Sequence, residues 1–263
     1  MIDSEPVLPN RYRMLGSHVD SMTIPDMHAL IGHAVATRQR LTMVSQNVHS
    51  IYTLHHDPDL RAMQQSATFV RIDGMPIIVI GRLLGYPLEA RHRTGWMDWL
   101  DPFMTEAGMR GWRLFYLGSR PDAAALGEAR LRERYPDVHL TVHHGHFDME
   151  PAGADVEAVL AVIADAQPDV LIVGMGMPRQ EAFLRRFGER ITAPVRLTSG
   201  AALDYVAGVI PTPPRWLGRL GVEWLYRLLS EPRRLWRRYL VEPWFVFRLA
   251  IRDLIWRPDR SRT

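Results

Sequence analysis

The carboxylate of Asp73 is the side chain in this sequence best suited to chemistry. It follows the short apolar run 68–72, which has the composition of a strand, and Gly74 comes directly after it. A carboxylate at a strand end, beside a glycine that lets a ligand approach the backbone, suits a general base. Asp-Gly pairs also form Asx turns and helix caps, so the pair alone leaves a structural role open.

Two glycine turns could bind an anionic group. The β-branched run 169–173 ends at Gly174, Gly176 and Pro178, and Pro178 suits the first turn of a following helix. Gly118-Ser119 lies at the end of another apolar run, shortly before a second proline. Free N–H groups at a helix start favour anions, and two such turns facing one crevice would suit a nucleotide diphosphate. Each turn alone is also compatible with a β–α connection that binds nothing.

Other polar residues carry weaker signals. Asn47 follows the apolar run 41–45 and could bind a substrate hydroxyl or cap the next helix; the sequence leaves both open. His143, His144 and His146 form a histidine run, but they follow a strand, where alternate side chains point to opposite faces. We therefore expect neither a metal nor another cofactor.

The elements that position these residues alternate between strand and helix. Strand-like runs at 41–45, 68–72, 112–117, 138–142, 169–173 and 195–199 are separated by helical patterns. This alternation predicts an α/β fold with a mostly parallel, Rossmann-like sheet flanked by helices. Residues 1–22 show no useful periodicity and are interpreted as an irregular lead-in. Three prolines between 208 and 214 end the pattern, so we predict a core of residues 1–209 and a helical appendage of 210–263.

The appendage is basic and rich in tryptophan. From 211 to 263 there are 12 arginines and 5 acids, and five of the eight tryptophans lie there. Arginine with interleaved tryptophan suits a phospholipid headgroup layer, with nucleic acid as the competing partner. No apolar run approaches the ~20 residues of a membrane span. The sequence has no cysteine, and its first residues lack the pattern of a signal peptide. We expect a cytoplasmic protein on the inner face of the cell membrane.

Five stretches resemble, in order, the landmarks of the WecG/TagA/CpsF glycosyltransferases. They are 45–47 (Ser-Gln-Asn), 73–74, 117–119, 173–181 and 200–208. The stretch 214–234 is similar to the C-terminal signature of that family almost residue for residue. Two positions depart from the pattern: Ser45 replaces a threonine, and Thr212-Pro213-Pro214 replaces Arg-Ala-Pro.

The resemblance implies a metal-independent, inverting hexosyltransferase that moves a sugar from a UDP-sugar to a polyprenyl-diphosphate-linked saccharide, for cell-surface polysaccharide or exopolysaccharide. The sugar would be N-acetylmannosamine, its uronic acid or glucose. Asp73 would be the base, and arginines of the appendage would complete the site over the diphosphate. The resemblance and the glycine turns together give these candidate substrate-binding residues: Ser45, Asn47, Gly74, Gly118, Ser119, Gly174, Gly176, Pro178, Gln180, Glu181, Arg215, Arg219 and Arg227.

Two other functions compete with this interpretation. A nicotinamide-dependent oxidoreductase would need GxGxxG after the first strand and an acid about twenty residues later, and neither is present. If the protein were a non-catalytic membrane-associated nucleotide-binding protein, the strand-end carboxylate of Asp73 would have no function. We expect a UDP-sugar, a lipid-linked acceptor and a membrane surface as partners, and no nucleic acid. The sequence leaves a monomer and a homo-oligomer both open.

Overall fold

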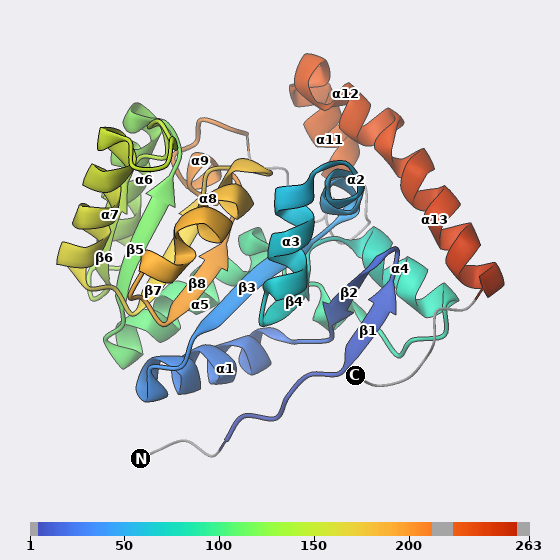
Figure 1. The fold of residues 1–263 in the computed structure, drawn as a ribbon, viewed down its shortest axis with the longest axis horizontal. Coiled ribbons are helices and arrows are strands. Elements are labelled where there is room, and N and C mark those ends of the chain that lie inside the picture. Colours follow the sequence, from blue (N-terminus) through green and yellow to red (C-terminus); the bar gives the residue numbers. More distant parts are fainter. Residues whose placement is uncertain (1–4, 212–222, 257–263) are drawn as a thin grey trace.

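The computed structural model describes residues 5–211 and 223–256. Its centre is a parallel sheet of six strands in the order β4-β3-β8-β7-β5-β6 (Figure 1). All of these strands except the edge strand β6 are largely buried, as expected when helices cover both faces of a parallel sheet. The predicted α/β class is confirmed. The strands are β3 (Leu41–Gln46), β4 (Phe69–Ile72), β5 (Arg113–Gly118), β6 (His139–His143), β7 (Val170–Gly174) and β8 (Val195–Thr198).

Two layers of helices enclose this sheet. One face packs against α1 (Ile24–Thr37), α5 (Trp96–Arg110), α6 (Pro121–Arg134) and α9 (Ala202–Val206). The other face packs against α3 (Pro58–Ser66), α7 (Ala154–Ala166) and α8 (Arg179–Phe187). The remaining connections include α2 (Val48–His56), α4 (Met75–Leu83) and the 3-10 turns η1 (Ala90–His92) and η2 (Gly188–Arg190). The chain therefore alternates strand and helix as its sequence pattern predicts.

The interpretation of the first residues as irregular is wrong for residues 11–20. Strands β1 (Arg11–Met14) and β2 (Ser17–Asp20) form an antiparallel hairpin. Its turn, Leu15-Gly16, has positive φ at both residues, a conformation that hairpins usually build with Asn-Gly or Asp-Gly. Asp20 joins the hairpin to the sheet, because its Oδ2 accepts a hydrogen bond of 2.7 Å from the main-chain N–H of Val70 in β4. A leucine at the turn hides the hairpin signal in the sequence.

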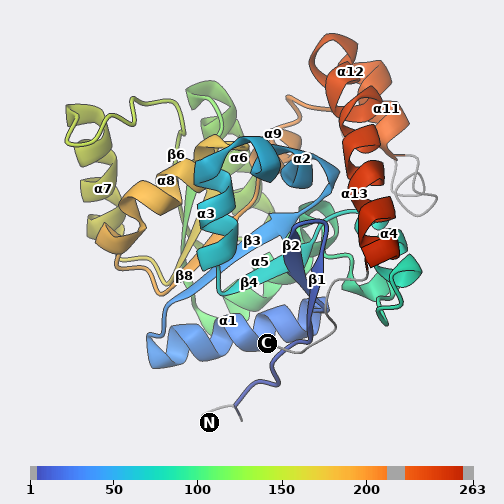
Figure 2. The same cartoon turned by 45° about the vertical axis from the view of Figure 1, so that its right-hand side comes forward.

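The predicted C-terminal helical appendage is confirmed as α11 (Glu223–Ser230), α12 (Pro232–Leu240) and α13 (Glu242–Trp256), which lie together along one side of the molecule (Figures 1 and 2). Val246 and Ala250 of α13 are buried in one hydrophobic cluster with residues of the hairpin, α2 and α4. Asp253 accepts a hydrogen bond of 2.5 Å from the main-chain N–H of Leu15. The appendage thus packs on the hairpin side of the fold.

A boundary at 209 stays a prediction, because it adjoins residues 212–222, which lie outside the described chain. Within the described helices, none combines the length and the apolar character needed to cross a membrane.

Candidate active site

The carboxyl ends of the parallel strands bring the predicted residues to one edge of the sheet. Asn47 follows β3, Asp73 follows β4, Gly118 ends β5 and Gly174 ends β7. Because ligands of open α/β sheets bind outside the carboxyl ends of strands, this edge is the expected place for a site.

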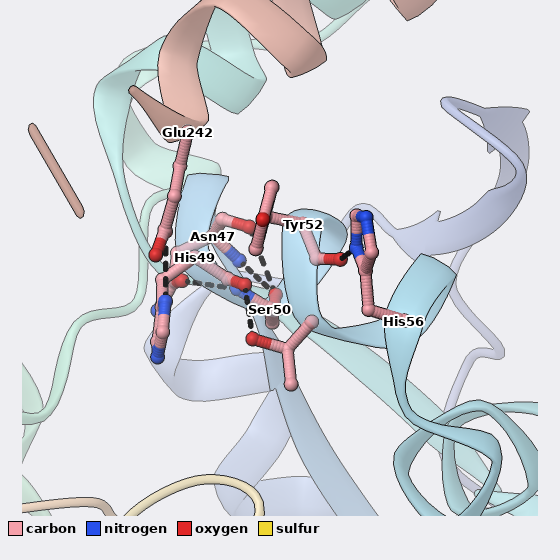
Figure 3. Close-up of polar contacts among 7 residues, drawn as sticks. Asn47, His49, Ser50, Tyr52, His56 and Glu242 are labelled. Carbon is pink, nitrogen blue, oxygen red and sulfur yellow. Dashed lines mark hydrogen bonds and ion pairs between the residues drawn. The ribbon is translucent and has the colours of Figure 1, made fainter. Parts of the chain in front are cut away.

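Asp73 and Asn47 are hydrogen-bonded to each other. Asn47 Nδ2 donates to Asp73 Oδ2 at 3.4 Å, and the Asp73 N–H donates to the carbonyl of Gln46 at 2.8 Å, which continues the strand pairing into the site. Asn47 also caps α2, since its Oδ1 accepts from the Ser50 N–H at 2.9 Å (Figure 3). The amide therefore fills both available roles: its oxygen caps the helix and its nitrogen orients the carboxylate.

Two glycines leave room around the Asp73 carboxylate. Gly74 has a φ of +140°, which side-chain-bearing residues rarely adopt, and it begins α4. A Cβ at Gly95 would lie 3.0 Å from Asp73 Oδ1, so the Gly95 backbone passes closer than most residues would allow. Asp73 itself is only half-buried. A half-buried carboxylate between glycines can meet a hydroxyl group of a substrate.

The turns after β5 and β7 form a second part of the edge. A Cβ on Gly118 would overlap the main chain of Gly174, so the two strand ends can approach this closely only as glycines. Ser119 has a φ of +62°, and its buried Oγ has no hydrogen-bond partner within the described chain. The connections from β5 and β7 leave in opposite directions, to β6 and to β8. A crevice at such a switch point, with an unsatisfied hydroxyl, is suited to a polar ligand.

The Gln180–Glu181 pair lies buried in the first turn of α8. Gln180 Oε1 accepts from the Gly200 N–H at 3.0 Å, and Gln180 Nε2 donates to Glu181 Oε1 at 2.7 Å. Burial raises the pKa of Glu181 to about 7. The second oxygen, Oε2, is buried and has no partner among the residues described. The pair therefore ties α8 to the turn after β8 and leaves one carboxyl oxygen unsatisfied.

Helices of the appendage contribute arginines to this end of the molecule. The Arg227 guanidinium of α11 lies over the Tyr205 ring, 5.4 Å from its centroid, and Tyr205 belongs to α9, which follows β8. Arg238 of α12 is half-buried; burial lowers the pKa of its guanidinium, and the negative charge of Asp73 is among the groups that oppose this shift. The appendage thus brings positive charge to the end of the molecule that holds Asp73.

A hydrogen-bond contact holds the start of α13 beside the site. His49 Nδ1 lies 2.8 Å from Glu242 Oε2, and His49 is in the first turn of α2, two residues after Asn47 (Figure 3). Glu242 is buried. The contact joins the appendage to the same helix end that Asn47 caps.

The other predicted residues have the following places. Ser45 is buried in β3, in register with Arg71 of β4. Gly176 has a φ of +77°, and Pro178 forms the cap of α8. Arg215 and Arg219 lie outside the described residues. The His143 and His144 rings lie tilted against each other at the end of β6, with centroids 4.6 Å apart. In the described part of the chain, no three His, Cys, Asp or Glu side chains are grouped so that they could hold a metal ion.

Two buried residues near this edge of the sheet were not predicted from the sequence. Tyr116 of β5 fills the space beneath Gly174, where it hydrogen-bonds Ser199 Oγ at 2.8 Å and accepts from the Leu203 N–H at 3.2 Å. Burial raises the pKa of its hydroxyl well above the usual range. Arg71 is a single charged residue inside the apolar strand β4. Its charge within an apolar run is a signal that could have identified it; Tyr116 gives no such signal.

Comparison with known proteins decides the family. The sequence model described as "Glycosyl transferase WecG/TagA/CpsF family" matches residues 12–260. The chain belongs to this family. Two similar relatives are from Staphylococcus aureus strains MW2 and NCTC 8325 / PS 47, and both are named N-acetylglucosaminyldiphosphoundecaprenol N-acetyl-beta-D-mannosaminyltransferase. Each is 27% identical over 240 residues, which cover 90% of this chain and 91% of the relative.

The match extends over both the sheet and the appendage. The predicted family is therefore confirmed, and the protein is a glycosyltransferase of the WecG/TagA/CpsF family. Asp73, both glycine turns and helices α11 to α13 all lie within the matched residues.

Proposed function

We propose that this WecG/TagA/CpsF glycosyltransferase transfers N-acetylmannosamine from its UDP derivative to a polyprenyl-diphosphate-linked saccharide, with inversion at the anomeric carbon. The observation that carries the proposal is the Asp73–Asn47 pair at the carboxyl edge of the sheet, on the edge that also holds the two glycine turns. The names of the Staphylococcus aureus relatives support this donor and acceptor. Its product would enter the synthesis of a cell-surface polysaccharide.

In this mechanism Asp73 acts as the general base. The acceptor hydroxyl attacks the anomeric carbon, the bond from that carbon to the UDP oxygen breaks, and the hydroxyl proton passes to the Asp73 carboxylate. A base in hydrogen-bond reach contributes about 10² to 10⁴ in rate. Asn47 holds the carboxylate through its amide nitrogen. A single displacement of this kind inverts the configuration of the sugar.

The departing UDP gains negative charge that the protein must stabilise. The turn at Gly176 and the Ser119 hydroxyl suit the diphosphate, because oriented donors stabilise developing anions. Arg227 and Arg238 of the appendage supply positive charge at the same end of the molecule. We assign metal-independent leaving-group stabilisation to these groups.

The appendage would also hold the enzyme against the membrane that carries the acceptor. On α13 the residues Trp244, Phe247, Ile251 and Ile255 are exposed, whereas Glu242, Val246, Ala250 and Asp253 are buried. At 3.6 residues per turn these two sets lie on opposite sides of the helix. An exposed apolar stripe with tryptophan, next to the exposed Arg233 and Arg237 of α12, suits the interface of an anionic membrane.

A panel of donors tests the proposal. The enzyme would be incubated with a lipid-diphosphate-linked N-acetylglucosamine acceptor and, in turn, UDP-N-acetylmannosamine, its uronic acid and UDP-glucose. We expect transfer from UDP-N-acetylmannosamine, and a β-linked product by NMR. Preference for another donor would correct the sugar, and a retained configuration would rule out the single displacement. Thermal stabilisation by NAD but not by UDP would favour an oxidoreductase instead.

A further inference from the structure

Helix α4 is apolar on two sides, although one of these sides is exposed. Ile77 and Ile78 are fully buried in the hydrophobic cluster that α4 shares with α13. On the outer side, Val79 and Leu83 are 48% and 65% exposed. A surface helix ordinarily carries polar side chains on its outer side. Packing of the fold therefore accounts for the inner side of α4 but not for the outer one.

The exposed apolar residues of α4 form a stripe that begins at the site. Pro76 is also exposed, and Pro76, Val79 and Leu83 are spaced by three and four residues, which places them on one face of the helix. We call these three residues the α4 stripe. The helix begins two residues after Asp73, so its axis leads away from the proposed base. From the rise of an α-helix, Val79 and Leu83 lie about 6 and 12 Å along the axis from its first residue.

Two polar side chains also lie near Asp73. Asn47 Nδ2 donates to its carboxylate at 3.4 Å. A Cβ at Gly95 would lie 3.0 Å from Asp73 Oδ1 and 3.9 Å from Arg93 Nη1, so the Arg93 guanidinium adjoins the carboxylate across Gly95. Asn47 and Arg93 therefore suit the hydroxyl and phosphate groups of a ligand, whereas α4 suits its apolar part.

The proposed acceptor combines a polar head with a long apolar chain. Its sugar hydroxyl must reach Asp73, and its diphosphate separates the sugar from the polyprenyl chain. One sugar ring and a diphosphate together are comparable in length to the distance from the start of α4 to the segment between Val79 and Leu83. A chain that begins at this distance from the base would meet the α4 stripe.

We propose that the α4 stripe binds the first isoprene units of the acceptor's polyprenyl chain, so that the lipid leaves the site along α4. The inference rests on the proposed function, in which Asp73 is the base and the acceptor is lipid-linked. Because α4 and α13 share one hydrophobic cluster and lie side by side (Figures 1 and 2), a chain that follows α4 arrives beside α13. The two surfaces have different tasks: α4 binds the chain of the substrate, whereas α13 contacts the bilayer.

Binding of soluble prenyl diphosphates tests the inference without relying on sugar transfer. Geranyl and farnesyl diphosphate differ by one isoprene unit, and calorimetry would measure their affinities for the full chain, with UDP present to occupy the donor site. An isoprene unit that lies on the stripe buries only one of its sides, so we expect farnesyl diphosphate to bind about tenfold more tightly. In the double variant Val79→Gln with Leu83→Gln, this preference should fall below about twofold.

A matched control is Leu126→Gln with Val162→Gln. These two residues are 43% and 40% exposed on α6 and α7, so the control removes exposed apolar area away from α4. It should keep the preference for farnesyl diphosphate. If circular dichroism shows that the α4 variant does not fold, Val79→Ala with Leu83→Ala replaces it. The absence of a preference in wild type, or an equal preference in wild type and the α4 variant, would overturn the inference.

Sedimentation velocity and vesicle co-sedimentation identify the other possible occupants of the α4 stripe. If the α4 variant loses an oligomer that wild type forms, and keeps the preference for farnesyl diphosphate, the stripe is an interface between copies of this chain. If it loses vesicle binding and keeps that preference, the stripe contacts the bilayer. Either result would overturn the inference.

Transfer assays separate the inference from the proposed function. The ratio of kcat/KM for a polyprenyl-linked acceptor to that for a short-chain acceptor should fall at least about tenfold in the α4 variant. If the α4 variant loses the preference for farnesyl diphosphate but wild type transfers no sugar, the proposed function fails and the lipid site stands. If wild type transfers sugar and the ratio is unchanged in the variant, the lipid site fails alone.

Discussion

At the scale of single residues, the site depends on one carboxylate that is accessible and one that is buried. Asp73 is half-buried and oriented by Asn47, whereas Glu181 is enclosed and has one unsatisfied oxygen. Carboxyl groups in such different surroundings suit different tasks: an accessible carboxylate can exchange protons with a substrate, and an enclosed carboxyl group favours its neutral form.

Replacing Asp73 with Asn should abolish most turnover and keep the fold. The amide is nearly isosteric and still accepts from Asn47, but it cannot take the proton, so we expect kcat to fall by about 10² to 10⁴. Calorimetric affinity for UDP should remain within about twofold. Asp59→Asn, at a carboxylate of α3 paired with Arg185, serves as the control and should retain full activity. Turnover close to wild type in the Asp73 variant would show that another group is the base.

Replacing Glu181 with Gln should stabilise the protein at neutral and alkaline pH. Burial raises the pKa of Glu181 from 4.5 to about 7. As the pH rises through this window the unfolded chain loses the proton first, so folding stability falls. The loss is complete above pH 7 and amounts to about 3 kcal/mol. Urea unfolding should therefore show a gain for the variant at pH 8 and almost none at pH 4.5. Glu189→Gln, at an exposed position, should show no such pH-dependent gain.

The sequence predicts site residues that follow strands better than residues inside them. Asn47 and Asp73 each come directly after an apolar run, so the end of the run locates them. Arg71 and Tyr116 acquire their roles from partners distant in sequence, Thr94 for one and Ser199 for the other. A periodic pattern carries no information on which distant carbonyl or hydroxyl a buried polar group will meet.

At the scale of elements, α13 has two apolar sides with different neighbours. One side is packed in the cluster that includes the hairpin, α2 and α4, and the opposite side is exposed. The hydrogen-bond contact between His49 and Glu242 fixes the start of this helix beside the site. The helix that presents the exposed apolar side is therefore also joined to α2 at the site.

Replacing Trp244, Phe247 and Ile255 of α13 with Ser should weaken binding to anionic liposomes by at least about tenfold. Each side chain is exposed, so its loss removes apolar area from the contact and leaves the packed side intact. Co-sedimentation with vesicles measures the effect, and circular dichroism checks the fold. Leu126→Ser with Val162→Ser, exposed positions on α6 and α7, forms the control. Equal sedimentation of all variants would place membrane binding elsewhere.

At the scale of the whole molecule, the sequence predicts the class of the sheet but not its strand order or the N-terminal hairpin. Alternating strands and helices give the parallel class, because the connections leave few other arrangements. The pattern does not predict the order of the strands in the sheet. That order, in which β8 lies between β3 and β7, depends on contacts between residues distant in the sequence. The hairpin was missed because Leu15-Gly16 lacks the usual turn residues.

Excess EDTA should leave sugar transfer within about twofold of the untreated rate. The expectation rests on the turn at Gly176, on the Ser119 hydroxyl, and on Arg227 and Arg238, which would stabilise the departing diphosphate. The measurement compares initial rates with and without chelator. Restoration of a lost rate by Mg²⁺ or Mn²⁺ would instead direct attention to His143, His144 and His146.

The position of β8 between β3 and β7 has a consequence for how the enzyme is made. As the chain is synthesised, β3 and β4 can pair early, and β5, β6 and β7 can pair later, but the two groups share no strand contact until β8 has been added. The base belongs to the first group and the glycine turns belong to the second. On the ribosome the two groups of strands therefore stay unpaired with each other until the Val195–Thr198 strand emerges, and only then does the sheet edge that carries the active site become continuous.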